Sequence, residues 1–153
     1  MTLEQIFNLL PNQIVEELKV LEQNKKWHPE IYVYDHMVLV YNKVEEYFPD
    51  DDELKICAVF HDLGKIDATF LKEDGTPTSP GHETFASSYI DKYCPKHYNI
   101  ERIKSVCLYH MKAHLFKNGE IKNPKKIKNF ENHPYFIDIM KFEKCDEEGV
   151  GNA

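Results

Sequence analysis

The sequence lacks several features that mark whole classes of protein. Its four cysteines, Cys57, Cys94, Cys107 and Cys145, form no CxxC pair, and no stretch approaches the ~18 apolar residues that a membrane span needs. The N-terminus has no basic start before an apolar run, and no run alternates apolar and polar residues between turn signals. We therefore expect reduced, buried thiols in a cytoplasmic protein with no membrane segment, no export signal and no substantial sheet.

A large excess of positive charge is also missing. The formal net charge is −7, which argues against binding along duplex DNA, because that mode depends on many Lys and Arg contacts. A single phosphate needs only a local cluster of donors, so a small anionic ligand stays open. With 153 residues, 42% apolar and 29% charged, we expect one globular domain with a real core.

The apolar residues recur at helical spacing and predict an all-α protein, a single bundle of about six helices. The N-terminal region, 1–26, holds a short helix, a turn at Pro11 and a second helix that packs on the core. The later helices are expected at 34–48, at 52–63 with Asp52 or a neighbour as its cap, and at 82–93, 99–114 and 133–147. A loop at 66–81 and a lysine-rich connector at 117–128 separate them.

The candidate chemistry lies in histidines and aspartates that come from different predicted helices. His61 and Asp62 are adjacent at the end of one helix, where Gly64 can end it or open a turn. His36 comes from the helix before, and Asp146 from the last helix. Imidazole and carboxylate ligands with open positions suit a metal ion that polarises a phosphoryl oxygen and activates water. These four residues are the predicted metal ligands.

The same residues carry a resemblance to a known family. The order of His36, the His61–Asp62 pair and Asp146 resembles the HxnHDxnD signature of the HD superfamily of metal-dependent phosphohydrolases. The stretches from Trp27 to His36, from His61 to Lys65 with Thr69, at Asp74–Gly75 and at Gly81–Glu83 are similar to the HD domain of bacterial CCA-adding tRNA nucleotidyltransferases. The resemblance covers about 27–149.

The resemblance implies a free-standing HD domain over 27–149, since the length leaves no room for a nucleotidyltransferase domain. It implies hydrolysis of a phosphomonoester or cyclic phosphodiester on a nucleotide or an RNA end. The cofactor is a divalent ion, one or two per chain, and Mn, Fe, Co, Ni, Zn and Mg all remain open. A di-iron oxygenase and a nucleotide-binding module without turnover are the alternatives. The oligomeric state is not predicted.

Two parts of the ligand set have alternatives. The last ligand is assigned to Asp146 because the family motif ends in Asp followed closely by Gly, but Glu143 or Asp138 could serve instead. His82 and His110 fall where some HD relatives bind a second metal with Asp62 as the bridge; otherwise they face phosphate around a single ion. His114 lies four residues after His110, on the same helical face, and can join either role.

Other residues are assigned roles beside the metal. Lys65 is expected to meet a phosphate oxygen and to stabilise charge that develops in the reaction, while Asp62 also accepts a proton from water. Thr69 and His82 are further candidates for substrate contact, and Glu83 for orienting a ligand histidine. His28 is equally consistent with a functional position and with a packing corner. His97 and His133 have no assigned role.

Lysines and aromatic residues are interpreted conservatively. A run of lysines could form a rim that binds a polyanion, but most such runs are solvated, and the latter interpretation is favoured here. The run consists of Lys117, Lys122, Lys125, Lys126 and Lys128. Aromatic residues at helical spacing are assigned to the core rather than to base stacking. They include Tyr89, Tyr93, Tyr109, Phe130 and Phe142.

Overall fold

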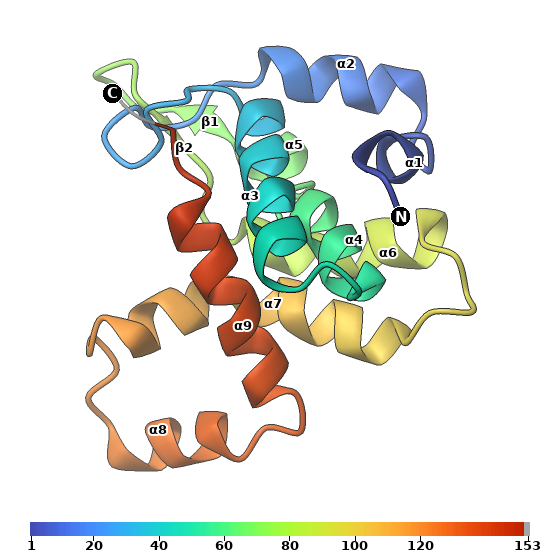
Figure 1. Ribbon diagram of the computed structural model, residues 1–153. Helices are drawn as coiled ribbons and strands as arrows, with labels where there is room; N and C mark the ends of the chain where they lie inside the picture. Colours follow the sequence, from blue (N-terminus) through green and yellow to red (C-terminus); the bar gives the residue numbers. More distant parts are fainter. Residues whose placement is uncertain (152–153) are drawn as a thin grey trace.

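A computed structural model describes residues 1–151, and most of them are helical (Figure 1). The helices are α1 (Leu3–Phe7), α2 (Asn12–Val20), α3 (Val33–Tyr47), α4 (Asp52–Phe60), α5 (Lys65–Ala68), α6 (Ala86–Tyr93), α7 (Ile100–Lys117), α8 (Pro124–Glu131) and α9 (Phe136–Glu148). A short 3-10 helix, η1 (His82–Phe85), precedes α6, and strands β1 (Phe70–Leu71) and β2 (Pro77–Thr78) pair antiparallel. The prediction of an all-α protein is confirmed.

Local sequence explains where several helices begin. In the first turn of α1, the Thr2 hydroxyl accepts a hydrogen bond from the Gln5 amide at 3.1 Å, and Gln5 Oε1 accepts one from the Thr2 amide at 2.8 Å. Pro11 separates α1 from α2, as expected. The carboxylate of Asp51 accepts from the Leu54 amide at 3.0 Å, so the cap of α4 comes from the neighbour of Asp52.

Helix α4 is the centre of the bundle. Every residue from 54 to 60 is buried, and a helix that is buried all round must be surrounded by other elements. Helices α3, α7 and α9 pack against it, and α9 also packs on α3 and α7. The chain that leaves α4 therefore carries His61 and Asp62 into the interior of the protein.

The loop before α3, the β1–β2 hairpin and the end of α9 lie together at one end of the bundle (Figure 1). Backbone hydrogen bonds close this loop, from Gln23 N to Ile31 O at 2.8 Å and from Val33 N to Leu21 O at 3.0 Å. Ile31 has a φ of 70°, in the left-handed region that few β-branched residues adopt. The loop is thus held in one specific conformation beside the first turn of α3.

Two local expectations were wrong. The segment 66–81 contains the β1–β2 hairpin, whose strands are too short to show an alternating pattern. Gly75, with φ 81°, and the Asp74 carboxylate, which accepts from the Thr76 amide at 2.9 Å, form its turn. The expected connector 117–128 contains the start of α8, where Asn123 caps the first turn and Pro124 follows.

The N-terminal helices lie on the bundle: α1 contacts α4 and α2 contacts α3. All four cysteines are free and buried, as expected. The aromatic residues assigned to the core are buried or packed against it. Within residues 1–151, no helix is both long enough and apolar enough to cross a bilayer.

Candidate metal centre

Six of the predicted site residues converge where α3, α4, α7, η1 and α9 meet. They are His36, His61, Asp62, His82, His110 and Asp146, and each is between 0 and 6% exposed. His61 caps the end of α4, as the sequence indicated for the His–Asp pair. Burial of so many titratable groups is costly unless they are paired or bind a metal.

Gly64 lets η1 approach this turn. A Cβ atom at position 64 would lie 1.9 Å from the backbone oxygen of His82, closer than any real contact. Glycine therefore allows the backbone of η1 to rest against the turn after Asp62. That approach brings the His82 ring to the Asp62 carboxylate.

In each of the four converging histidines, Nδ1 donates a hydrogen bond to a backbone carbonyl. The pairs are His36 with Gly149 at 2.8 Å, His61 with Cys57 at 3.0 Å, His82 with Ser79 at 2.9 Å and His110 with Cys107 at 2.6 Å. Because a carbonyl only accepts, Nδ1 carries the proton in each ring, and Nε2 of the neutral imidazole offers a lone pair. This bonding pattern is typical of metal-ligating histidines.

The first set of inward-facing atoms joins His36, His61, Asp62 and Asp146. Asp146 Oδ1 lies 2.8 Å from His36 Nε2 and 3.3 Å from His61 Nε2. Asp62 Oδ2 lies 3.1 Å from His61 Nε2 and 3.6 Å from His36 Nε2. Two nitrogens and two carboxylate oxygens thus surround one point, and together they can hold a metal ion.

The second set uses the other oxygen of the same aspartate. Asp62 Oδ1 lies 3.0 Å from His82 Nε2 and 3.4 Å from His110 Nε2. The two Nε2 atoms are 3.1 Å apart, so two lone pairs face each other unless a proton or a cation lies between them. Asp62 thus faces both sets, one with each carboxylate oxygen.

The charges around His61 favour a cation. Nε2 of His61 is buried and has no hydrogen-bond partner among residues 1–151, although carboxylate oxygens of Asp62 and Asp146 lie 3.1 and 3.3 Å away. Burial lowers the pKa of His61, but the charges of Asp62 and Asp146 outweigh it and raise the pKa to about 10. Burial raises the pKa of Asp62, and the charge of His61 more than reverses this, so the carboxylate stays ionised. The donors present therefore fit a divalent ion, which can replace the extra proton.

Comparison with protein-family models matches residues 33–133, about two thirds of the chain, to the HD domain. The chain belongs to the HD domain family. A search of curated proteins finds no match. The matched residues include the His61–Asp62 pair and end before Asp146, so the case for Asp146 comes from its distances. We refer to His36, His61, Asp62, His82, His110 and Asp146 as the HD centre.

The structure separates the three carboxylates considered for the last ligand. Asp146 lies in the HD centre, Glu143 accepts a hydrogen bond from His114 Nδ1 at 3.2 Å, and Asp138 pairs with Arg102 at 2.9 Å. Of the three, only Asp146 is placed to join His36 and His61.

His114 differs from the histidines of the HD centre. Its Nε2 donates to Asp146 Oδ2 at 2.7 Å while Nδ1 contacts Glu143. Burial lowers the pKa of His114, but its hydrogen bonds to Asp146 and Glu143 outweigh this and raise the pKa to about 10. His114 thus contacts carboxylates at both ring nitrogens, and it meets Asp146 through Oδ2 and not through the Oδ1 that faces His36 and His61, so it is placed to orient Asp146.

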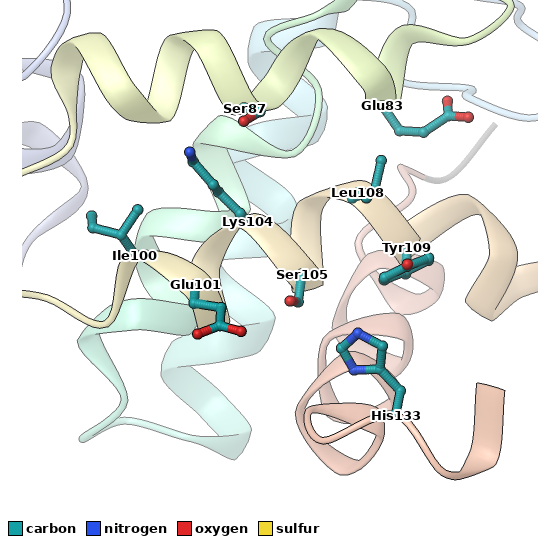
Figure 2. A pocket seen from close by; sticks show the side chains of 9 residues that line it. All are labelled: Glu83, Ser87, Ile100, Glu101, Lys104, Ser105, Leu108, Tyr109 and His133. Carbon is teal, nitrogen blue, oxygen red and sulfur yellow. The ribbon is translucent and has the colours of Figure 1, made fainter. Parts of the chain in front are cut away.

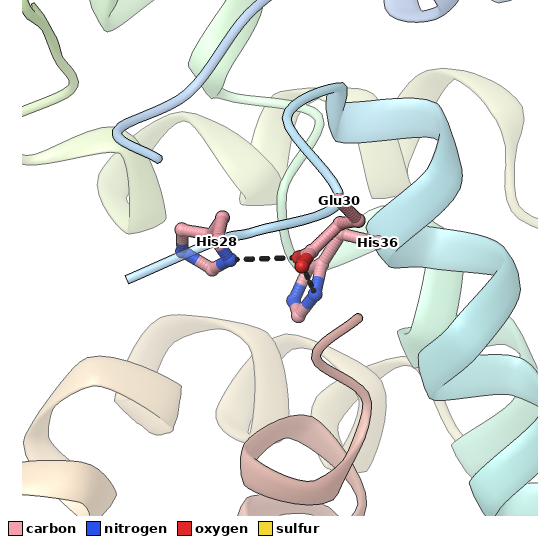
Figure 3. A group of neighbouring side chains, drawn as sticks. All are labelled: His28, Glu30 and His36. Atoms are coloured by element: carbon pink, nitrogen blue, oxygen red, sulfur yellow. Dashed lines mark hydrogen bonds and ion pairs between the residues drawn. The ribbon is translucent and has the colours of Figure 1, made fainter. Parts of the chain in front are cut away.

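Glu30, which was not predicted as a site residue, contacts His36 from outside the HD centre (Figure 3). Its Oε1 lies 3.1 Å from His36 Nδ1 and accepts from His28 Nδ1 at 3.0 Å; its side chain is 4% exposed. Burial raises the pKa of Glu30, but the hydrogen bonds from His28 and His36 hold it well below its ordinary value. His28 is thus part of a polar network. The feature of the sequence that could have indicated this role is the position of Glu30, two residues after His28.

Lys65 is buried beside the HD centre. Its Nζ donates to Gln23 Oε1 at 2.7 Å and lies 3.3 Å from Asp62 Oδ2. Gln23 also lies 3.5 Å from Glu30, which links the two networks. An ammonium has three N–H groups, so the third can meet a phosphate oxygen.

Thr69 and Glu83 lie further from the HD centre. The Thr69 hydroxyl bonds to the Ser79 hydroxyl at 2.6 Å, at the open end of the β1–β2 hairpin, and substrate contact by Thr69 stays a prediction. The Glu83 carboxylate is 3.8 Å from His82 Nδ1, too far for a hydrogen bond. The carbonyl of Ser79 orients His82 instead.

A pocket of about 560 Å³ opens over the HD centre, and its lining includes His28, Lys65 and His82. A second pocket, of about 460 Å³, lies along α7 (Figure 2), and its lining includes Lys104 and His133. No residue of the HD centre lines the second pocket. The first pocket is therefore the one that gives access to the candidate chemistry.

The lysine-rich segment lies mainly on α8, apart from the end of α9 that carries Asp146 (Figure 1). Lys117 pairs with Glu143 at 3.4 Å and with Glu147. Nothing in this arrangement brings the lysines of α8 to the pocket over the HD centre, whose lining contains none of them.

Proposed function

We propose that the protein is a metal-dependent phosphohydrolase that acts on a phosphomonoester or cyclic phosphodiester of a nucleotide or an RNA end. The observation that carries the proposal is the convergence of four histidine Nε2 atoms on the carboxylates of Asp62 and Asp146, with every Nδ1 bonded to a carbonyl. Membership of the HD domain family supports the same class of reaction.

The ligand roles follow from the two sets of distances. His36, His61, Asp62 and Asp146 would hold one ion; His82 and His110 would hold a second, with Asp62 as the bridge. A divalent ion bound there supplies Lewis-acid chemistry, which polarises a phosphoryl oxygen and lowers the pKa of water.

The chain's own residues position and stabilise the reacting group. Lys65, held by Gln23 and Asp62, presents its remaining N–H to a phosphoryl oxygen and stabilises the negative charge that develops on it. Asp62 keeps its second proposed role, accepting a proton from the attacking water. His82 lines the pocket and is a further candidate for contact with the phosphate.

The pocket over the HD centre and the sequence both support a nucleotide substrate. The lining of the pocket includes the cationic side chains of Lys65 and Lys72, which suit phosphate. The resemblance to the HD domain of CCA-adding enzymes, stretching from Trp27 to Glu83, also favours nucleotides or RNA ends. The net charge of −7 favours short substrates over long nucleic acids.

The test is release of inorganic phosphate from 2′-, 3′- and 5′-nucleotides in the presence of Mg, Mn, Co or Ni. For 2′,3′-cyclic nucleotides, opening of the ring is measured by chromatography. Asp62→Asn is the inactive variant, and Asp50→Asn, an exposed aspartate before α4, is its matched control. We expect turnover that needs metal, persists in Asp50→Asn and vanishes in Asp62→Asn. Equal turnover by both variants would overturn the proposal.

A di-iron oxygenase is the second candidate, because Asp62 faces two separate histidine sets with its two oxygens. Two irons per chain, visible absorption and oxygen consumption with an organic substrate would favour it over hydrolysis. Tight nucleotide binding without any turnover would instead indicate a binding module.

A further inference from the structure

The pocket over the HD centre has two chemically different parts. Lys65 and His82, which lie next to Asp62, are almost completely buried, at 6% and 5% exposure. Three large apolar side chains also line the pocket, and these are exposed: Trp27 at 64%, Met111 at 40% and Leu115 at 44%. A buried polar part and an exposed apolar part suit a ligand with one anionic end and one apolar end.

Two of the apolar residues adjoin residues of the polar site in sequence, and the third lies on the same helix as one of them. Trp27 precedes His28, whose ring lies 4.8 Å from the ring of His36, measured between centroids. Met111 follows His110. Leu115 lies four residues after Met111, so the two side chains form one stripe on α7.

The loop holds Trp27 in place. The carbonyl of Asn24 accepts from the amides of Trp27 at 3.2 Å and His28 at 2.9 Å, within the segment closed by the bond from Gln23 to Ile31. An indole on a fixed turn loses little conformational entropy when a ligand binds. The backbone that carries the ring is therefore already ordered, although most of the side chain is exposed.

The chemistry of this apolar part points to a flat aromatic group. Tryptophan stacks on aromatic ligands, methionine makes favourable contacts with aromatic rings, and leucine adds apolar area without demanding a hydrogen bond. A nucleobase has a stacking face whatever its identity, so stacking binds bases with little selectivity. Lys72, which also lines the pocket, adds positive charge for a phosphate.

We propose that Trp27, Met111 and Leu115 form a nucleobase subsite that recognises the base by stacking and accepts purines and pyrimidines alike. The inference rests on the proposed function, because it takes the phosphate to lie at Lys65 and the HD centre. The inference adds a second binding contact for the substrate. The base, and not the phosphate alone, determines which phosphoesters bind well.

The test uses Trp27 itself, which is the only tryptophan in the chain. Metal-loaded protein is mixed with AMP isomers, CMP isomers or ribose 5-phosphate, and tryptophan fluorescence is read by stopped flow before product accumulates. Signals are corrected for nucleotide absorption with free N-acetyltryptophanamide. We expect saturable quenching by both nucleotides and none by ribose 5-phosphate.

Kinetics with variants supply the second measurement. Trp27→Leu should raise KM for nucleotides about 5- to 160-fold with a smaller effect on kcat, and Trp27→Phe should restore much of the loss, because one stacked base contributes ~1–3 kcal/mol. Ile137→Ser, an exposed apolar residue on α9 at 70% exposure, is the matched control and should keep the wild-type KM.

The outcomes separate this inference from the proposed function. Metal-dependent phosphate release from nucleotides, without quenching and with an unchanged KM in Trp27→Leu, would overturn the base subsite and leave the hydrolase proposal standing. Quenching by nucleotides without phosphate release would support the subsite and count against the hydrolase. Equal quenching by ribose 5-phosphate and AMP would overturn the subsite.

Discussion

Helices α4, α7 and α9 meet in two polar clusters, one at each end of α4. At the N-terminal end, Arg102 of α7 pairs with Asp51 at 2.7 Å, Glu53 at 2.9 Å and Asp138 at 2.9 Å. At the C-terminal end lies the HD centre. The first cluster contains its own permanent cation, because arginine stays charged at every relevant pH. The second contains carboxylates and imidazole lone pairs.

The helix ends enlarge this difference. Asp51, Glu53 and Asp138 lie at the first turns of α4 and α9, where the positive end of the helix dipole favours carboxylates. His61 and Asp146 lie at the last turns of the same helices, where the dipole favours a cation. The Arg102 cluster is thus complete as folded, whereas in the HD centre the ammonium of Lys65 reaches only one of the two carboxylates, that of Asp62 at 3.3 Å, and the remaining donors fit a metal ion.

The largest expected effect comes from breaking the HD centre. Asp62→Asn removes the carboxylate that faces both histidine sets, so we expect phosphate release to fall by more than ~100-fold, beyond the 10- to 100-fold typical of losing a partner outside the ligand shell. The thermal midpoint of the metal-free protein should fall, because buried Lys65 loses its carboxylate partner, so turnover is measured at a temperature where circular dichroism shows the variant to be folded. A variant with near-normal turnover at saturating metal would contradict the assignment.

The converse change breaks the Arg102 cluster. Arg102→Met leaves three carboxylates without their cation, and we expect the free energy of unfolding to fall by roughly 2–4 kcal/mol, since Arg102 is mostly buried. Denaturant titration measures this. Metal affinity, measured on the folded protein, should remain within a few fold of wild type; a large loss of affinity would show that the two clusters are coupled.

A smaller effect is expected from the network around His36. Glu30→Gln keeps an acceptor of similar shape but removes the negative charge that faces His36 Nδ1, so metal affinity should fall about ten-fold. Isothermal titration of metal-stripped protein checks this, with the exposed Glu131→Gln as matched control. Equal affinities in the two variants would mean that the carbonyl of Gly149 alone orients His36.

The smallest expected effect is the pH dependence of the stability that the Asp51–Arg102 pair contributes. Burial raises the pKa of Asp51, but the hydrogen bond from Arg102 more than reverses this and lowers the pKa below its ordinary value. The pair therefore stabilises the fold fully above the unfolded pKa of about 3.8 and loses its contribution as pH falls through the lower folded value. Asn at position 51 is still a good helix cap, so Asp51→Asn loses only the ion pair with Arg102. The amount by which its free energy of unfolding lies below that of wild type should therefore shrink below about pH 4.

The sequence predicted much of one cluster and none of the other. The ordered His36, His61–Asp62 and Asp146 pattern is distinctive, because such residues rarely follow one another in that order by chance. Arg102 was not singled out, since a lone arginine on an amphipathic helix has no sequence pattern. Only folding shows that Asp51 and Asp138 meet it.

The supporting residues were hidden for a different reason. Gln23 and Glu30 reach Lys65 and His36 because the loop closes through the left-handed Ile31, a conformation that residue preferences do not favour. The β1–β2 hairpin and α8 are short, so periodicity carried little information about them. Long amphipathic helices, by contrast, were predicted with bounds close to those observed, as α3 and α9 show.

The most direct test of the central claim is the metal stoichiometry of stripped and reloaded protein, measured by elemental analysis after equilibrium dialysis against Mn, Co or Ni. We expect wild type to bind two ions per chain, His110→Ala to keep one, Asp62→Asn to lose tight binding, and Arg102→Met to match wild type. Wild type without bound metal, or Asp62→Asn with the full wild-type content, would contradict the account.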